Sequence, residues 1–302
     1  MNKIKFFKNF SSRLKFNYKL SNKTWFGTGG KAKYYFTPLN EIELSLFLKF
    51  IPKSIPIFMI GLGSNIIIRD GGFNGVVIKL GEKFKFIDID YSKKTFSAGC
   101  ASKDLDLSYF CMNNSITGFE FLVGIPGSLG GSLRMNASCF NQSISDKLIS
   151  VRVMDRSGKI HILLRKQINF EYRKSLLPDD WFFLDATFQI EKKNKNIIRK
   201  NMNKIKEKRK FSQPINMRTG GSTFKNIDKK KAWKLIDEVG FRGYKFGSAQ
   251  VSGKHTNFLI NTGKCKSLEL ELLGEKIKER VFERKGIKLE WEIKRIGDFV
   301  KV

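Results

Sequence analysis

The sequence predicts an α/β protein of the mixed α+β kind, built from more than one domain. Its 302 residues allow two or three domains, and 41% of them are hydrophobic, as in globular proteins. Short apolar runs alternate with stretches whose apolar residues recur at helical spacing. The glycine turn 61–65 lies between two apolar runs, 55–60 and 66–69, whereas a Rossmann fold needs a glycine turn followed by a helix. A Rossmann assignment is therefore poor.

Strands and helices are expected to alternate through the N-terminal two thirds of the chain. Residues 1–20 are expected to be irregular or helical. Asn40 precedes an acidic turn and predicts a helix start, and Ser102 predicts another. The stretch 191–210 is basic and poorly patterned, so we expect a linker or a crossing helix. The expected strands are 33–36, 55–60, 66–69, 76–79, a hairpin of 86–91 with 95–98, a second hairpin of 149–154 with 159–164, and 181–190.

The C-terminal third is expected to form two helices and two strands. One helix is expected over 232–239 and another over 267–285. The second helix has one apolar face, made of Leu270, Leu273, Ile277 and Val281. The run 258–260 predicts a strand. A final strand over 289–297 would place its two glutamates on one face and its tryptophan on the other.

A glycine-rich stretch, 124–136, is the most informative local pattern. Gly124 and Gly127 bracket a proline, which predicts a tight turn, and Ser128 can cap a short helix. Paired glycines, Gly130 and Gly131, then stand on its first turn, although each costs roughly 1 kcal/mol against alanine in a helix. Two interpretations remain open. The bare backbone binds an anion such as a phosphate, or the helix packs tightly on a neighbour.

The net charge of +29 raises the question of a nucleic-acid partner. Lysines gather at 204–210 and 229–234, but lysine, isoleucine, asparagine and phenylalanine are frequent along the whole chain. The charge forms no single arginine-rich patch with interleaved aromatics. We therefore favour a composition bias over nucleic-acid binding. A positive field would still attract small anionic substrates.

Cysteine and histidine usage indicates a reducing compartment and no metal site. The four cysteines lie far apart without a Cys-x-x-Cys pair, which fits the cytoplasm. His161 and His255 cannot make a metal site by themselves, and a structural role is preferred for His255. No run approaches the roughly 18 apolar residues of a membrane helix, so no membrane association is expected.

Six motifs in order resemble one enzyme family. They are Gly61-Leu-Gly-Ser-Asn65, Gly124-Ile-Pro-Gly-Ser-Leu-Gly-Gly131, Tyr172-Arg173, Gly221-Ser-Thr-Phe-Lys-Asn226, Lys254-His-Thr-Asn-Phe258 and Leu289-Glu-Trp-Glu-Ile293. Together they are similar to the UDP-N-acetylenolpyruvoylglucosamine reductase family over about residues 20–297. The resemblance implies reduction of an enolpyruvyl ether to UDP-N-acetylmuramate with FAD and NADPH, in peptidoglycan synthesis. The short interval from Arg173 to Ser222 resembles the family's second type, which lacks an extra tyrosine loop.

The resemblance also implies the domain organisation. It predicts a two-part FAD-binding domain of the vanillyl-alcohol-oxidase type, over 1–83 (joined by 289–302) and 84–200. A C-terminal α+β domain over 201–288 would bind the UDP-sugar substrate.

Site residues carry over from the family by motif. The implied catalytic residues are Arg173, Ser222 and Glu292. The implied cofactor-binding residues are Gly61, Gly63, Ser64, Asn65, Gly124, Ile125, Pro126, Gly127, Ser128, Gly130 and Gly131. The implied substrate-binding residues are Tyr172, Lys225 and Asn226.

The reaction needs these residue types. A hydride added to the β-carbon of an unsaturated carboxylate leaves an enolate, whose charge spreads onto the carboxyl group. Arg173 can hold that carboxylate, a protonated Glu292 can donate to the developing charge, and Ser222 can protonate the α-carbon. By spacing alone, simpler interpretations exist for each residue. Arg173 could form a surface ion pair, Ser222 could cap a helix, and Glu292 could be a solvent-facing strand residue. The ordered motifs favour the catalytic ones.

Alternatives and departures accompany the resemblance. Another flavin oxidoreductase of the same fold would lack the 221–226 stretch, and a nucleic-acid-binding protein would carry no flavin. The family often has an arginine where Gly27 stands here, and a proline where Ile227 stands. Neither position is catalytic, so these departures affect contacts rather than the reaction.

Overall fold

The computed structural model describes residues 10, 12–227 and 230–300, and the chain divides into two compact units. The first unit comprises Met1–Lys15, Tyr34–Leu62 and Gly75–Glu207, and the second comprises Phe16–Lys33, Gly63–Asn74 and Lys208–Val302. Most of the expected irregular leader lies outside the described residues. Its end is a strand instead, β1 (Leu14–Lys19). This strand is mostly exposed at the edge of a sheet, so no apolar alternation marks it in the sequence.

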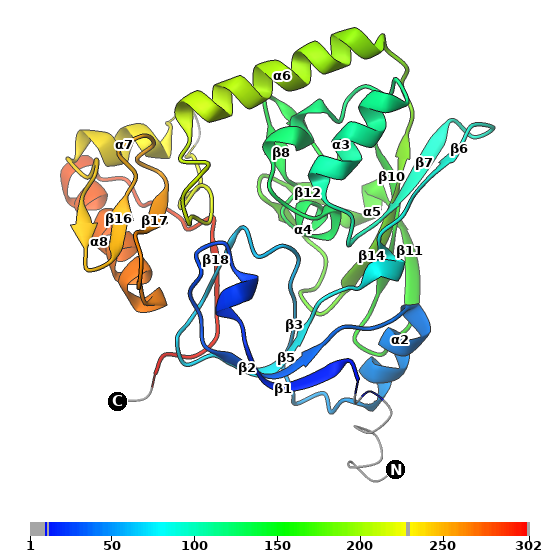
Figure 1. The fold of residues 1–302 in the computed structure, drawn as a ribbon, viewed down its shortest axis with the longest axis horizontal. Coiled ribbons are helices and arrows are strands. Elements are labelled where there is room, and N and C mark those ends of the chain that lie inside the picture. Colours follow the sequence, from blue (N-terminus) through cyan, green and yellow to red (C-terminus); the bar gives the residue numbers. More distant parts are fainter. Residues whose placement is uncertain (1–9, 11, 228–229, 301–302) are drawn as a thin grey trace. The chain divides into compact units, whose positions relative to one another are not determined.

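The first unit contains an antiparallel five-stranded sheet of order β11-β10-β14-β7-β6 (Figure 1). Its strands are β6 (Ile87–Asp90), β7 (Thr95–Gly99), β10 (Leu148–Met154), β11 (Ile160–Leu164) and β14 (Phe182–Gln189). Both expected hairpins are confirmed, because β6 pairs with β7 and β10 pairs with β11. The central position of β14 and β7 brings the end of β7 into the interior, where Cys100 follows it.

A four-stranded sheet has the order β1-β2-β5-β3, with β2 at Lys31–Phe36, β3 at Ile57–Met59 and β5 at Phe73–Ile78. The parallel pair of β3 and β5 belongs to the first unit at Ile57–Met59 and Val76–Ile78. Helix α2 (Glu41–Phe50) begins as expected, because the Asn40 side chain accepts a hydrogen bond from the Glu43 N–H at 3.0 Å. Strand β3 is only half-buried, which corrects the expected buried strand.

Several further helical segments belong to the first unit. They are α3 (Asp104–Asn113), the one-turn segment η3 (Glu120–Gly124), the short α4 (Leu129–Arg134) and α5 (Arg165–Ile168). Helix α4 packs on β7 and β14. The small elements are η1 (Ser21–Lys23), η2 (Glu82–Phe84), the pair β8 (Ser138–Cys139) and β9 (Gln142–Ser143), and the pair β12 (Phe170–Glu171) and β13 (Lys174–Ser175).

The basic stretch after β14 is a long helix, α6 (Lys195–Ser212), so the helical alternative is confirmed (Figure 1). Its buried residues are Ile198, Met202 and Ile205, which pack with Met112 and Val123. These three residues recur at helical spacing, and the lysines occupy the other positions. Among the described residues, no helix is long and apolar enough to cross a membrane.

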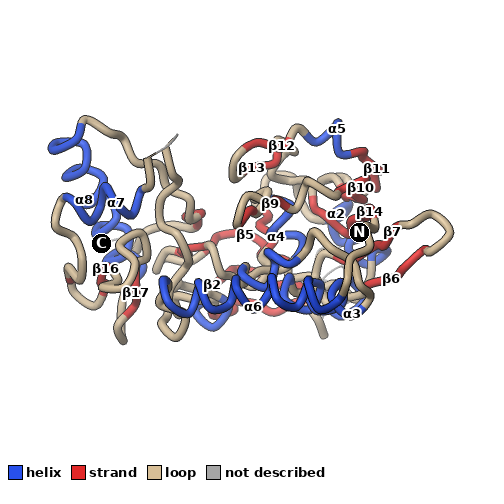
Figure 2. The backbone as a smooth tube through the Cα atoms, turned by 90° about the horizontal axis from the view of Figure 1, so that it is seen from above, coloured by secondary structure: helices blue, strands red, loops and turns tan. Residues whose placement is uncertain are grey.

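In the second unit, one helix packs on a small antiparallel sheet and a second helix packs on the first (Figure 2). The sheet has the order β15 (Lys245–Phe246), β16 (Ala249–Val251) and β17 (Leu259–Asn261), and the helices are α7 (Ala232–Glu238) and α8 (Ser267–Lys285). Both helices and the apolar face of α8 are as expected. A two-stranded parallel sheet joins β4 (Ile66–Ile68) to β18 (Lys294–Ile296). The prediction of a strand over 289–297 is therefore wrong in length, because the strand covers only Lys294–Ile296. Before it, Trp291 forms an isolated bridge with Phe224.

Candidate active site

The glycines of the 124–131 turn have different surroundings. A Cβ added at Gly127 would lie 2.4 Å from Asp104 Oδ2, and one at Gly130 would lie 3.1 Å from Cys100 Cβ. A Cβ at Gly131 would meet only the Ser128 hydroxyl, at 3.7 Å. Tight packing thus explains Gly127 and Gly130, whereas Gly131 is exposed and has room for a Cβ.

Backbone hydrogen bonds leave two donors on this turn. The N–H groups of Leu129 and Gly130 donate to the carbonyls of Ser102 and Cys100, each at 3.0 Å. The N–H groups of Ser128 and Gly131 make no hydrogen bond with any residue that the structure describes. The Ser128 hydroxyl does not cap α4, contrary to expectation. Only Gly131 of the two is exposed, because Ser128 is buried, so the turn offers fewer accessible donors to a phosphate group than the glycine pattern predicts.

Gly61, the first residue of the glycine turn 61–65, lies against Ser128 of the 124–131 turn. A Cβ at Gly61 would come 2.4 Å from the Ser128 hydroxyl, so that hydroxyl would have to move to admit a larger residue. The contact lies within the first unit and joins two motifs that are far apart in sequence. These residues are therefore suited to hold the diphosphate of a dinucleotide.

The second part of that turn belongs to the second unit. Gly63 has a φ of 69°, which favours glycine, and its carbonyl accepts a hydrogen bond from the Trp25 N–H at 2.9 Å. Ser64 is half-buried in the same turn. The Asn65 side chain donates to the Glu292 carbonyl at 3.1 Å, and its own carbonyl accepts from the Lys294 N–H. A predicted cofactor residue thus positions a predicted catalytic residue.

Two segments of the second unit bring Ser222 and Glu292 together. The Glu292 N–H donates to the carbonyl of Thr223 at 2.8 Å, directly beside Ser222. The buried Asn257 amide accepts from the Phe224 N–H at 2.9 Å and donates to the Phe224 carbonyl at 2.8 Å. Asn257 belongs to the Lys254–Phe258 motif, whose sequence predicts no role for it. Asn257 holds the Ser222 segment in place, and its partners are non-local.

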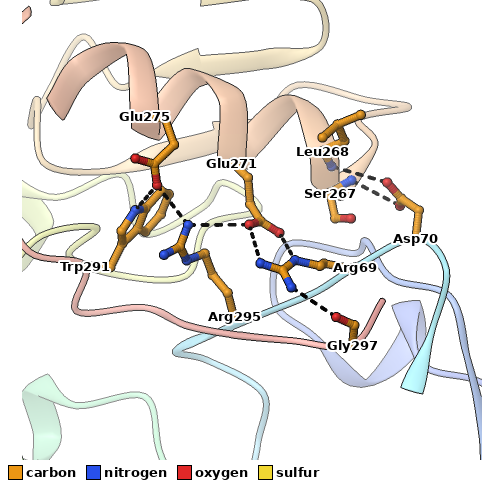
Figure 3. A network of polar contacts seen from close by, with 9 residues as sticks. All are labelled: Arg69, Asp70, Ser267, Leu268, Glu271, Glu275, Trp291, Arg295 and Gly297. Carbon is orange, nitrogen blue, oxygen red and sulfur yellow. Dashed lines mark hydrogen bonds and ion pairs between the residues drawn. The ribbon is translucent and has the colours of Figure 1, made fainter. Parts of the chain in front are cut away.

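Trp291, the residue before Glu292 in the chain, is held by a polar network (Figure 3). The Trp291 indole N–H donates to Glu275 Oε1 at 2.7 Å, and the Arg295 guanidinium lies 4.4 Å from the centre of the Trp291 ring. A Cβ at Gly274 would lie 2.2 Å from that ring, so the helix needs glycine there. Arg295 also donates to Glu275 at 2.9 Å.

The same network continues to β4. Arg69 donates to the two oxygens of the buried Glu271 at 2.9 and 3.1 Å, and Asp70 accepts from the N–H groups of Ser267 and Leu268 at the start of α8 (Figure 3). The acceptor at the helix start is favourable because those N–H groups have no intrahelical partner. Side chains from the turn after β4, from α8 and from β18 therefore fix the segment that carries Glu292.

Arg173 and Tyr172 lie in the first unit, on the turn between β12 and β13. Arg173 has a φ of 60°, an unusual value for a residue other than glycine. Its Nη1 donates to the carbonyl and the hydroxyl of Ser138, at 3.0 and 2.6 Å. The guanidinium lies 5.2 Å from the centre of the Tyr172 ring, and Tyr172 is about half exposed. Backbone strain combined with side-chain anchoring is typical of a functional position.

The remaining predicted substrate residues have structural partners. Lys225 Nζ lies 3.1 Å from Glu290 Oε2, and the Asn226 side chain accepts from the Ala232 N–H at the start of α7. The two departures from the family also have local explanations. Gly27 has a φ of 70° and packs under the Arg218 side chain, and the Ile227 N–H donates to the Lys230 carbonyl, which a proline could not do.

Two buried acids of the first unit have raised pKa values. Burial raises the pKa of Asp104 to about 7, and the hydrogen bond from Ser132 opposes that shift. Burial also raises the pKa of Asp185 to about 6, against the lowering effect of Arg152 at 2.9 Å. Burial and these carboxyls raise the pKa of the Cys100 thiol well above its usual range, so it stays neutral. Asp104 could not be identified from the sequence, because only its burial in the fold distinguishes it from other acidic residues.

One of the two histidines, His255, packs against an aromatic ring. His255 lies 4.7 Å from the Phe258 ring centre, and burial lowers its pKa. Among the described residues, no group of three or more His, Cys, Asp or Glu side chains could hold a metal ion.

Comparison with known proteins decides the family. A family model described as the C-terminal domain of UDP-N-acetylenolpyruvoylglucosamine reductase matches residues 213–296, and an FAD binding domain model matches residues 32–163. The chain is 44% identical to the UDP-N-acetylenolpyruvoylglucosamine reductase of Rickettsia prowazekii (strain Madrid E), covering 94% of this chain and 96% of that one. The chain belongs to the UDP-N-acetylenolpyruvoylglucosamine reductase family.

Other relatives agree. The reductase of Orientia tsutsugamushi (strain Ikeda) is 44% identical over 93% of each chain. The crystal structure of the reductase from Thermus caldophilus superposes with a TM-score of 0.80 at 28% identity, over 94% of this chain and 98% of that one. These matches confirm the predicted family, the fold class and FAD as the cofactor of the N-terminal part. The order of the motifs alone was enough to identify the family.

Proposed function

We propose that this chain reduces UDP-N-acetylglucosamine enolpyruvate to UDP-N-acetylmuramate, with NADPH as the reductant and FAD as the bound cofactor. This is the family's step in peptidoglycan synthesis. The observation that carries the assignment of roles is the hydrogen bond from the Glu292 N–H to the Thr223 carbonyl at 2.8 Å. This hydrogen bond supports the proposed roles of Ser222 and Glu292, because it joins the segments that carry them, and Asn65 of the proposed cofactor turn donates to the Glu292 carbonyl.

In this proposal the domains divide the work. Residues 1–83, joined by 289–302, and residues 84–200 hold FAD, and residues 201–288 bind the UDP-sugar. The FAD binding model at 32–163 and the C-terminal domain model at 213–296 support this division. The cofactor diphosphate would be held by the N–H groups of Ser128 and Gly131 beside Gly61.

Bound FAD would take a hydride from NADPH and supply it to the β-carbon of the enolpyruvyl group. Arg173, anchored through Ser138, holds the substrate carboxylate by its guanidinium. Glu292 in its acid form donates a hydrogen bond to the carboxyl group as the negative charge develops there. Ser222 gives its proton to the α-carbon and so completes the reduction. Tyr172, Lys225 and Asn226 are proposed to contact the sugar or phosphates.

The cellular compartment and the question of a nucleic-acid partner are inferred from the cysteines and from the distribution of charge. We place the enzyme in the cytoplasm, because its four cysteines are free thiols. Nucleic acid is not among the proposed partners, since the lysines are distributed along the chain.

The visible absorption spectrum of the purified protein tests this function. The expected result is a flavin spectrum that NADPH bleaches and that UDP-N-acetylglucosamine enolpyruvate restores. A flavin that NADPH bleaches but that only oxygen restores would instead indicate another flavin oxidoreductase of the same fold.

A further inference from the structure

A carboxyl group that the proposed reaction does not use lies beneath the 124–131 turn. Asp104, the first residue of α3, is fully buried. Its Oδ2 accepts a hydrogen bond from the Ser132 hydroxyl at 2.7 Å, and its Oδ1 has no hydrogen-bond partner within the described part of the chain. A carboxylate in this position would lack both a counter-charge and a full set of donors, which is costly in a protein interior.

This carboxyl contacts the turn itself. The Asp104 N–H donates to the Gly127 carbonyl at 3.0 Å, and a Cβ at Gly127 would lie 2.4 Å from Asp104 Oδ2. Its hydroxyl partner, Ser132, lies one residue after Gly131 in α4. The turn that offers N–H groups to a phosphate therefore rests directly on an ionisable acid.

The charged and titratable groups nearby offer Asp104 no salt bridge. On its own helix, Lys103 and Asp106 are exposed. From the neighbouring elements, Cys100 stays a neutral thiol, Asp185 pairs with Arg152, Glu120 accepts from Thr117 and Gly118, and Arg134 donates to the carbonyls of Leu177, Pro178 and Trp181. Thus none of the cations in this surrounding offsets a charge on Asp104.

We propose that Asp104 is a positioning residue for FAD, which supports the turn as a neutral acid and weakens FAD binding when it becomes a carboxylate. The inference rests on the proposed function, because that function places the FAD diphosphate on this turn. A carboxylate directly beneath the turn would repel the two negative charges of the diphosphate through a medium with little screening. The neutral acid has no such effect and can still accept the hydrogen bond from the Ser132 hydroxyl.

The pKa of Asp104, raised to about 7 by burial, makes both forms accessible near neutral pH. Removal of the Ser132 hydroxyl would raise that pKa further, since its hydrogen bond lowers it. Both phosphates of FAD are diesters and do not titrate in this range. A change of FAD affinity around pH 7 would therefore come from the protein.

The test measures FAD release from the purified holoprotein at about pH 6, about pH 7 and about pH 8, on either side of the Asp104 pKa. Free FAD is separated by ultrafiltration and quantified by fluorescence at several protein concentrations. The parent should bind FAD roughly tenfold more weakly at the highest pH than at the lowest. Asp104→Asn should show no such dependence, and Ser132→Ala should show it at a higher pH.

Asp185→Asn is the matched control, because Asp185 is also a buried acid with a raised pKa but has a cation partner. It should keep the pH dependence of the parent. The inference is overturned if Asp104→Asn retains that dependence, or if the parent shows none. A folded parent that holds no FAD at any pH would overturn the proposed cofactor turn itself, and a dependence lost only in Asp185→Asn would assign the effect to Asp185.

Discussion

Each unit of the molecule places a buried acid behind a segment of the proposed active site, and the two acids have different partners. Asp104 in the first unit has one hydroxyl partner, and burial raises its pKa to about 7. Glu271 in the second unit is only 4% exposed, yet it receives two hydrogen bonds from Arg69 and lies 3.5 Å from Arg295. Burial alone therefore does not determine how an acid behaves, because a cation partner offsets the cost of desolvation.

The two acids support segments that are held in place in different ways. The segment with Ser222 and Glu292 is fixed by ion pairs and by hydrogen bonds to Asn65 and Asn257. The cofactor turn is fixed by close packing of glycines over a titratable group. We expect the Ser222–Glu292 segment to be disrupted by loss of one partner. We expect the cofactor turn to respond to pH and to an increase in side-chain volume.

The largest expected effect concerns Ser222. Ser222→Ala should bind FAD and be bleached by NADPH at a near-normal rate. Its re-oxidation by the enolpyruvyl substrate should be slower by about a hundred- to ten-thousand-fold, because a positioned general acid contributes that much. Stopped-flow absorbance measures each half-reaction. Equal slowing of both halves would mean that Ser222 shapes the pocket, and re-oxidation at the parent rate would remove it from the mechanism.

The next effect tests the paired acid. Glu271→Gln should lower the free energy of unfolding by about 3–5 kcal/mol, because it leaves Arg69 without its carboxylate. Urea denaturation of both proteins measures the change. Lys285→Ala is the control, since its pair with Glu238 is exposed and should contribute less than about 1 kcal/mol. Similar losses in the two variants would contradict the distinction between buried and exposed pairs.

The unpaired acid should make stability depend on pH. The folded-state pKa of Asp104 is about 7 and its ordinary value is 3.8, so the folded protein binds more protons between these values. The contribution of Asp104 protonation to the free energy of unfolding is fully present below about pH 4 and is lost as the pH rises through about 7. Relative to Asp104→Asn, the parent should lose up to about 4 kcal/mol of unfolding free energy over this range. Denaturation at several pH values checks this, and parallel pH profiles would refute it.

The smallest effect separates the two glycines of α4. Gly130→Val should lower the free energy of unfolding by about 1–3 kcal/mol, because its side chain would press on Cys100. Gly131→Val should keep nearly the parent stability and yet be purified with little FAD, because its side chain would fill the open approach to the turn. Flavin content per protein and urea denaturation are the two measurements. Stoichiometric FAD in Gly131→Val would mean that the turn is structural only.

The sequence by itself determined the family and most of the helices. Six motifs in a fixed order identified the reductase family. Helix α2 begins at the Asn40 cap and α8 ends at Gly286 in the left-handed conformation, and both signals act within a few residues. The two hairpins were also predictable, because their strands are joined by short turns. These features depend on local interactions, which a single stretch of sequence contains.

Only the tertiary structure decided what the glycines and acids of the site do. It assigned Gly130 to packing on Cys100, placed Asn65 on the Glu292 carbonyl and shortened the expected final strand to Lys294–Ile296. It also distinguished the buried Asp104 from the exposed Asp106, two positions later on the same helix. Each of these outcomes depends on a partner distant in the chain, and burial and non-local hydrogen bonding are properties of the packed chain rather than of its local pattern.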